Sequence, residues 1–289
     1  MIRAIRRFVS NLKGKNKFIF FLVLLLICIM ALCIGIYTQF FYKYSDTDPF
    51  MIGINIGSKK TAEEYAILES NFNNLFQNTL HINSENVRVD KIEWAKDLVY
   101  AGYNLVNEDE NYYSVNAIIP VINIDTINAK KINNDIKSEF YEKANSVMRQ
   151  NEQNIIYNVS YIAFVNQDIL SVAVKSSLKE GNKPEKVTIK TYTYSLPDEL
   201  FLSLIDLIEL KKTTIGEVQK IITDSVRTAY NNSKIIAEEY GNVYERDLNS
   251  NIYKIENTKV FFLTQDGYVY VIYPYGNTDY TNEMDVLIF

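Results

Sequence analysis

Residues 112–148 read YYSVNAIIPVINIDTINAKKINNDIKSEFYEKANSVM, and the spacing of the apolar side chains changes within them. Residues 112–123 are rich in Val, Ile and Tyr, a composition typical of a β-strand. Pro120 predicts a strand edge or a bulge, because proline has no N–H to donate to a neighbouring strand. From Thr126 the apolar residues follow one helical stripe, namely Ile127, Ile132, Ile136, Phe140 and Met148. A strand followed by an amphipathic helix predicts an α+β fold.

Strand-like segments separated by turn residues make up much of the remaining chain. The sequence predicts further strands over 91–106, 154–164, 169–176, 186–194, 259–264, 268–273 and 284–289. The acidic run 107–111 is expected to connect the strands at 91–106 and 112–123, and Gln265-Asp266-Gly267 predicts a hairpin turn. We expect these strands to form an antiparallel sheet that packs with helices.

Three further helical segments are expected, at 61–80, 201–210 and 214–240. Thr61 with Glu64 fits a capping box at the start of the first, and Gly241 is the expected end of the last. The candidate core positions of the last helix are Ile215, Val218, Ile221, Ile222, Val226, Ala229, Ile235 and Ala237.

The N-terminal region predicts a membrane anchor. Residues 1–17 contain six basic and no acidic side chains, and residues 18–42 contain no charged side chain. A helix over 18–42 would measure about 37 Å, which exceeds the roughly 30 Å of hydrocarbon in a bilayer. Flanking charges at Arg6, Arg7, Lys17 and Lys43 would orient this helix with its N-terminus in the cytoplasm. We therefore expect a single-pass protein of the cell membrane, with a tether and helical segment at 43–94 and the C-terminal domain outside the cell.

A cleaved secretory signal is the main alternative to a retained anchor. Such a signal has a shorter apolar core and ends in small residues. Here the run ends in the aromatic segment 37–42, YTQFFY, which suits the membrane interface. Processing as a lipoprotein at Cys33 is disfavoured by the bulky Leu32 before it.

Cysteine usage and charge narrow the class of protein. Both cysteines, Cys28 and Cys33, lie in the membrane run, so the external domain can hold no disulfide and no thiolate metal site. This pattern is ordinary for a bacterial surface domain. The chain carries a net charge of −5, and its first 43 residues contain seven basic and no acidic side chains, so the remainder carries −12. That charge disfavours nucleic acid as a partner and would attract a cationic protein.

No pattern of catalytic, metal-binding or cofactor-binding residues stands out. His81 is the single histidine, which excludes an imidazole cluster, and the chain has neither a Gly-x-Ser-x-Gly elbow nor a phosphate-binding glycine loop. The acidic groups at 63–64, 108–110 and 238–239 are sequence neighbours that point to different faces. We expect no enzyme activity, no metal and no cofactor.

Tyrosines near the C-terminus are the candidate partner-binding residues. Tyr273 and Tyr275 end the predicted hairpin, and Tyr280 lies in the polar loop beyond it. Exposed tyrosines favour recognition of proteins or sugars. The alternative is that some of these side chains pack in the core of the sheet.

Several short phrases in this order resemble the bacterial DUF4163 and DUF3298 families. The first group is Ile119-Pro120-Val121-Ile122-Asn123, Asn128 and Ile132-Asn133-Asn134-Asp135-Ile136, followed by Leu170-Ser171-Val172. The second group is Phe201-Leu202-Ser203-Leu204-Ile205-Asp206-Leu207, Phe262-Leu263-Thr264 with Asp266-Gly267, and Pro274-Tyr275. The resemblance implies a DUF4163-like subdomain at 95–200 and a DUF3298-like subdomain at 201–289.

The resemblance implies a location at the cell envelope, because members include the ectodomain of a lysozyme-sensing anti-sigma factor and a non-catalytic part of a peptidoglycan deacetylase. With only about seventeen residues before the membrane run, we expect no sigma-factor binding here. Residues 276–283 are polar where the family has an apolar, glycine-containing phrase, which leaves the partner-facing loop open. The expected function is a non-catalytic binding or sensor module for a cationic wall-active protein or a wall component. The alternatives are a structural or assembly subunit of a membrane complex and, with least support, a cell-wall hydrolase.

Overall fold

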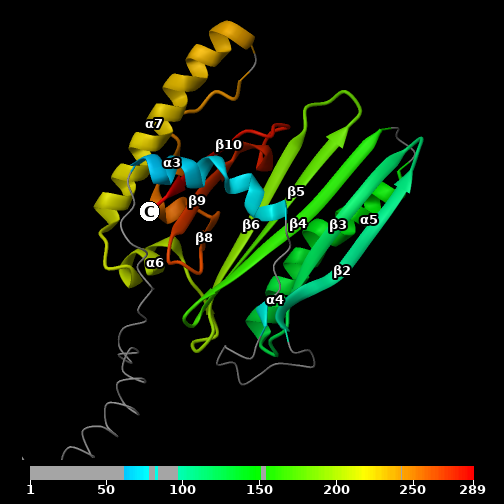
Figure 1. The fold of residues 1–289 in the computed structure, drawn as a ribbon, viewed down its shortest axis with the longest axis horizontal. Helices are drawn as coiled ribbons and strands as arrows, with labels where there is room; N and C mark the ends of the chain where they lie inside the picture. Colours follow the sequence, from blue (N-terminus) through cyan, green and yellow to red (C-terminus); the bar gives the residue numbers. More distant parts are fainter. Residues whose placement is uncertain (1–61, 78–81, 84–96, 151–153, 242) are drawn as a thin grey trace, which may run out of the picture. The chain divides into compact units, whose positions relative to one another are not determined.

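The computed structural model describes residues 62–77, 82–83, 97–150, 154–241 and 243–289, and all of them belong to one compact unit (Figure 1). The predicted tail, the membrane run and the flanking residues Arg6, Arg7, Lys17 and Lys43 lie outside these ranges, as does His81. No helix in the described ranges is both long enough and apolar enough to cross a membrane.

Two β-sheets and several helices confirm the predicted α+β class (Figure 1). The larger sheet has the strand order β1-β2-β3-β4-β5-β6-β7, and the smaller has the order β10-β9-β8. The larger sheet comprises β1 (Ile82–Asn83), β2 (Asp97–Asp109), β3 (Tyr113–Ile122), β4 (Ile155–Asn166), β5 (Ile169–Glu180), β6 (Lys186–Ser195) and β7 (Leu200–Phe201). The smaller comprises β8 (Phe261–Leu263), β9 (Val269–Pro274) and β10 (Met284–Ile288). The predicted boundary between residues 200 and 201 falls within β7, the last strand of the larger sheet.

One pair of strands departs from the predicted antiparallel arrangement. β3 and β4 are parallel and pair over Tyr113–Ala117 and Ile155–Val159, whereas every other neighbouring pair is antiparallel. The helical segment between β3 and β4 is the cause, because a helix that crosses over the sheet returns the chain in its original direction. β2 also extends through Asp109, so the predicted connection at 107–111 shortens to 110–112.

A bulge in β2 accommodates Pro120, as the sequence predicted. The β2–β3 register shifts between Ala101 and Tyr103, opposite Pro120 and Ile119. The bulged residue is Gly102, where an added Cβ would lie 2.1 Å from Val121 Cγ2. Pro120 lies beyond the part of β3 that pairs with β4, so no ladder hydrogen bond is lost there.

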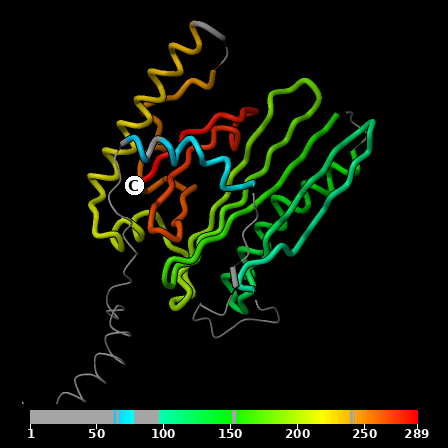
Figure 2. Tube along the Cα trace, in the orientation of Figure 1, coloured from blue at the N-terminus to red at the C-terminus, as the bar shows by residue number. Residues whose placement is uncertain are grey.

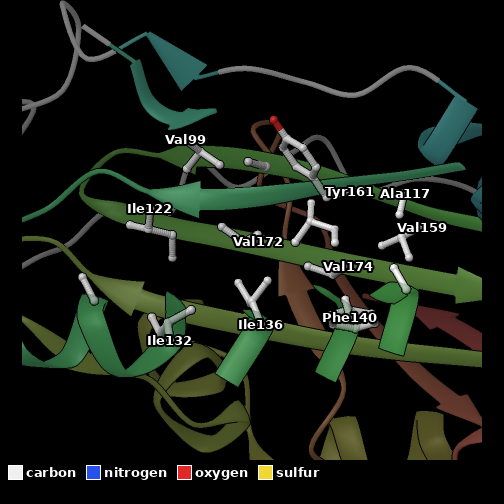
Figure 3. Packing of buried hydrophobic residues seen from close by; sticks show 14 of the residues in the cluster. Val99, Ala117, Ile122, Ile132, Ile136, Phe140, Val159, Tyr161, Val172 and Val174 are labelled. Carbon is white, nitrogen blue, oxygen red and sulfur yellow. The ribbon is translucent and has the colours of Figure 1, made fainter. Parts of the chain in front are cut away.

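One face of the larger sheet is covered by α4 (Ile127–Ile136), a π-helical turn (Lys137–Tyr141) and α5 (Glu142–Met148). Figure 3 shows Ile132, Ile136 and Phe140 pointing toward sheet residues, and all three are fully buried. Ile127 was predicted on this stripe but is 87% exposed, because it lies five residues before Ile132 and hence on a different face of the helix. The side chain of Asn133 joins α4 to β3, accepting from Ile122 N and donating to Ile122 O at 2.8 Å each.

The opposite face of the larger sheet packs against the smaller sheet and the first helices, α3 (Ala62–Ser70) and the 3-10 helix η2 (Phe72–Gln77). The core between the sheets consists of Phe72, Phe76, Ile162, Ala173, Val187, Ile189, Phe262, Tyr268, Tyr270, Ile272 and Ile288. β9 is the middle strand of the smaller sheet. Its residues on the face that points away from the larger sheet are buried as well.

The chain passes from β6 through α6 (Leu204–Leu210) and α7 (Ile215–Tyr240) before it returns as β8 (Figure 2). Capping boxes start both helices, at Ser203 with Asp206 and at Thr214 with Glu217, and α7 ends at Gly241 as predicted. Of the predicted core positions in α7, Val218, Ile222 and Val226 are buried. Ile215, Ile221, Ile235 and Ala237 are exposed, because they lie off the single stripe that faces β10 and the 3-10 helix η6 (Ile255–Asn257).

Candidate functional site

The structure separates the three predicted partner-binding tyrosines. Tyr273 and Tyr275 are buried, with 5% and 3% of their surface exposed, whereas Tyr280 is 50% exposed. The hydroxyl of Tyr273 lies 3.0 Å from Thr258 Oγ1, and that of Tyr275 donates to Asp285 Oδ2 at 2.5 Å. Tyr273 and Tyr275 therefore pack in the core, and of the three predicted residues only Tyr280 is exposed to solvent.

Tyr275 belongs to a buried polar cluster that holds the C-terminal region together. Arg246 donates from Nε to Asp285 Oδ2 and from Nη2 to Asp285 Oδ1, each at 2.8 Å. The rings of Tyr244 and Tyr275 stack with centroids 4.1 Å apart, and Tyr253 contributes a hydroxyl 2.9 Å from that of Tyr275. Burial and the Asp285 carboxylate both raise the pKa of Tyr275, so its hydroxyl stays protonated and remains a donor.

The loop that carries Tyr280 is fixed along the outer edge of β6. Val187 N donates to Thr281 O at 3.0 Å, and the side chain of Asn277 accepts from Ile189 N and donates to Ile189 O. A Cβ on Gly276 would lie 2.2 Å from Thr281 O and 2.3 Å from Val187 O, so only glycine permits this approach. The polar loop 276–283, left open by the sequence, is thus an ordered cap on an edge strand.

A cavity of about 390 Å³ opens beside Tyr280. The helical layer supplies Ser138, Glu139 and Lys143 to its wall, and the adjacent strands supply Tyr157, Ser176, Leu178, Lys186 and Thr188. Tyr157, Ser176 and Leu178 are buried and form the floor. Burial raises the pKa of Tyr157, which keeps its phenol neutral at physiological pH.

Positive charge is concentrated at this cavity although the domain as a whole is acidic. Lys183 Nζ and Lys186 Nζ lie 5.7 and 5.5 Å from the ring centroid of Tyr280. Lys183 is paired with Glu180 at 3.1 Å, and Glu139 is paired with Lys190 at 3.0 Å. Within the described part of the chain, neither Lys143 nor Lys186 forms an ion pair with a carboxylate. The cavity therefore combines an exposed aromatic ring, hydroxyl groups and two lysines, Lys143 and Lys186, for which the described residues supply no counter-ion.

The lining of the cavity determines which chemical groups it can contact. Its polar groups are hydroxyls, ammonium groups and one carboxylate that is already paired with Lys190. In the ranges that the structure covers, no group of three or more His, Cys, Asp or Glu side chains is placed to hold a metal ion. The absence of enzyme activity stays a prediction.

Buried tyrosines predict a loss of stability at high pH. Burial raises the pKa of Tyr270 and of Tyr273 to about 12, from an ordinary value of 10.0. The unfolded chain ionises its tyrosines first, so the free energy of unfolding should fall as the pH rises from 10 to 12. Lys211 has the opposite effect on the free energy of unfolding, which it should raise as the pH rises from about 8 to 10.5. Burial lowers the pKa of Lys211 to about 8 from 10.5, so the unfolded chain holds the proton more tightly in this range.

The effect of the tyrosines is therefore measured above pH 10.5. Denaturant midpoints recorded at pH 10.5, 11 and 11.5 should decline, while absorbance at 295 nm shows a class of tyrosines that titrates late. Midpoints that stay constant while all tyrosines titrate near pH 10 would contradict the prediction.

Sequence reasoning found Tyr280 but missed the residues around it. Lys143 lies in α5, Lys186 begins β6, and Tyr157 lies in β4, so only the tertiary fold brings them beside Tyr280. No motif or spacing in the sequence signals this proximity. A weak signal for Lys186 is its place directly after the turn at Gly181-Asn182-Lys183-Pro184, where one strand ends and the next begins.

No family model matches the chain, and no curated protein matches it. Solved structures that are similar to it include the following two. One is a protein from Pseudomonas aeruginosa PAO1, with 14% identity and a TM-score of 0.38, covering 63% of this chain and 83% of that one. The other is from Bacteroides fragilis, with 11% identity and a TM-score of 0.31, covering 61% and 79% of the two chains. Both are DUF3298 family proteins.

The resemblance to DUF3298 proteins is thus supported, and the resemblance to DUF4163 has no counterpart among these structures. The identities and TM-scores are too low to carry a function from either protein to this chain.

Proposed function

We propose that this protein is a membrane-anchored, non-catalytic binding module of the bacterial cell envelope whose external domain binds an anionic wall saccharide at Tyr280. The anchor is the charge-free run at 18–42. The observation that carries the proposal is the half-exposed Tyr280 ring at the mouth of a cavity of about 390 Å³, flanked by Lys183 and Lys186.

Each part of the cavity suits a charged sugar. An exposed aromatic ring can stack against the apolar face of a pyranose, and hydroxyl groups such as those of Ser138 and Thr188 can bond to its hydroxyls. Lys143 and Lys186 would pair with a carboxylate or phosphate on the same ligand. The net negative charge of the domain repels anions at long range. Only an anion whose shape also fits the cavity would gain enough from its lysines to bind.

The proposal is tested by cosedimentation of the full-length protein, held in nanodiscs, with purified bacterial wall sacculi. Tyr280→Ala is expected to weaken retention about 3- to 10-fold, the scale of one lost aromatic contact. Lys186→Gln should weaken it as well and reduce its dependence on salt. Tyr112→Ala is the matched control, because Tyr112 is a similarly exposed tyrosine (39%) at the turn between β2 and β3.

A second arm identifies the charged group. Extraction of the sacculi with hydrofluoric acid removes phosphate polymers, so loss of retention assigns the recognised charge to phosphate and unchanged retention assigns it to carboxylates. Equal retention of the wild type, Tyr280→Ala and Lys186→Gln would refute the site. Lysozyme serves as a cationic comparison, and salt-sensitive binding of lysozyme that Tyr280→Ala abolishes would show that the site takes a protein.

A further inference from the structure

A separate groove lies beside the smaller sheet, where β10 contacts both α3 and α7 (Figure 1). Its volume is about 600 Å³, and its lining comes from all three elements. Glu69 belongs to α3, Phe72 begins η2, Asp224 and Thr228 belong to α7, and residues 284–287 belong to β10. Tyr280 and its lysines are not part of this groove.

β10 is an edge strand, and part of its backbone is turned into the groove. Val269 and Phe289 exchange two backbone hydrogen bonds, at 3.0 and 3.1 Å, and the register continues through Leu287↔Val271. In an antiparallel pair these hydrogen-bonded positions alternate, so Met284 and Val286 direct their N–H and C=O groups away from β9. No residue of the described chain hydrogen-bonds to these outward groups. They can therefore pair with an added strand.

The charge of the groove indicates the side chains that such a strand would carry. Carboxylates at Glu69, Asp224 and Asp285 line it, and none of the lysines or arginines that the structure describes does. Asp285 is paired with Arg246, and Asp224 with Lys220. Glu69 has no cationic partner among the residues that the structure places, and burial raises its pKa. A basic side chain beside Glu69 would compensate a carboxylate that has no cationic partner within the described ranges.

We propose that this groove binds an extended, basic peptide segment of a partner protein, which adds to β10 as a fourth strand of the smaller sheet and places a lysine or arginine beside Glu69. Main-chain hydrogen bonds to Met284 and Val286 provide affinity in this mode, and alternate side chains provide selectivity. Ala229 of α7 lines the groove and offers apolar contact to the residues between the basic ones. The net charge of −12 on the chain beyond residue 43 draws a basic segment toward the domain.

The test uses the full-length protein in nanodiscs and an amide-capped peptide of nine residues in which threonine and lysine alternate. Bound peptide should slow hydrogen exchange of the amides of Met284 and Val286 about tenfold or more, while those of Asp285 and Leu287 are already slow in the free protein. The same peptide with N-methyl groups on all its internal amides keeps its charge but has no N–H to donate from either edge, so it should give no protection at Met284 and Val286.

Two protein variants separate charge from strand pairing. Glu69→Gln should weaken the binding of the lysine peptide about 2- to 5-fold at low salt. It should not change the binding of the same peptide with glutamine in place of lysine. Glu142→Gln is the matched control, because Glu142 is exposed on α5, which packs on the opposite face of the larger sheet. Protection of Met284 and Val286 by the unmethylated peptide, together with the loss in Glu69→Gln, supports the proposal.

Three outcomes would overturn it. Equal binding of the methylated and unmethylated peptides would show that charge alone attracts the peptide. Slow exchange at Met284 and Val286 in the free protein would show that the edge is already covered, and a dependence of that protection on protein concentration would identify a second copy as the occupant. Retention of wall sacculi is unaffected by Glu69→Gln in every case, so this test is independent of the Tyr280 site.

Discussion

Replacing Arg246 with alanine is expected to lower the free energy of unfolding by about 3 to 5 kcal/mol, the range for removing one partner of a buried ion pair. The side chains of Arg246 and Asp285 are only 7% and 10% exposed, and two hydrogen bonds of 2.8 Å join them. Without Arg246, the Asp285 carboxylate keeps the hydroxyl of Tyr275 as a donor but loses its counter-ion. The decrease in the free energy of unfolding would come mainly from this uncompensated charge on Asp285.

A double variant distinguishes the cost of an isolated charge from the contribution of the pair. Arg246→Met combined with Asp285→Leu removes both charges and should recover a large part of the lost stability, because apolar replacement of a buried pair is often close to neutral. Lys220→Ala is the control, since the exposed pair Lys220–Asp224 on α7 should contribute within about 0.5 kcal/mol. Denaturant unfolding of the full-length protein in detergent, followed by near-ultraviolet circular dichroism, measures all four proteins.

A result in which Arg246→Ala costs no more than Lys220→Ala would mean that water reaches Asp285 in solution. The same set of variants bears on the edge groove, because Asp285 lies in β10 and lines it. Loss of Arg246 would free a second carboxylate there, so the basic peptide should bind Arg246→Ala more tightly than wild type as long as the domain stays folded.

Most of the fold could be predicted from the sequence, because the period of the apolar residues changes clearly from strand to helix. The strands at 113–122, 155–166, 169–180 and 186–195 and the helix α7 were all expected within a few residues. The parallel pairing of β3 and β4 was not, since the pattern of side chains within a strand does not specify the direction of its neighbour. Ile127 and Ile235 were predicted to be buried but are exposed. The apolar character of a helical residue does not by itself show which face of the helix is covered.

The candidate site was predicted only in part, and the reason lies in the layering of the sheets. Tyr273 lies in β9, which is covered on both faces, so the side chains on either face of this strand are shielded from solvent. Tyr280 lies beyond the strand in a polar loop, where exposure is the usual outcome. The cations beside it, Lys143 and Lys186, come from elements more than ninety residues earlier in the chain, which no local pattern connects to Tyr280.

Replacing Phe262 with alanine is expected to lower the free energy of unfolding by about 3 to 5 kcal/mol, the range for truncating a buried aromatic residue. Phe262 is fully buried between the two sheets. Its ring stacks on Tyr270 with centroids 4.9 Å apart and lies 5.9 Å from Phe164 and 6.3 Å from Phe72. Alanine would leave a cavity that these three rings, held by different elements, can fill only in part.

The position of Phe262 makes this variant a test of domain organisation as well. β8, β4 and the helical segment η2 all contribute to the core around it, so the predicted subdomains at 95–200 and 201–289 share that core. If they unfold together, Phe262→Ala should move a single transition to lower denaturant without changing its slope. Phe201→Ala, at a residue that is 43% exposed in β7, is the matched control and should cost about 1 kcal/mol or less. Two separate transitions in Phe262→Ala would instead show that the larger sheet, with its own core around Ile136 and Phe140, is stable without the smaller one.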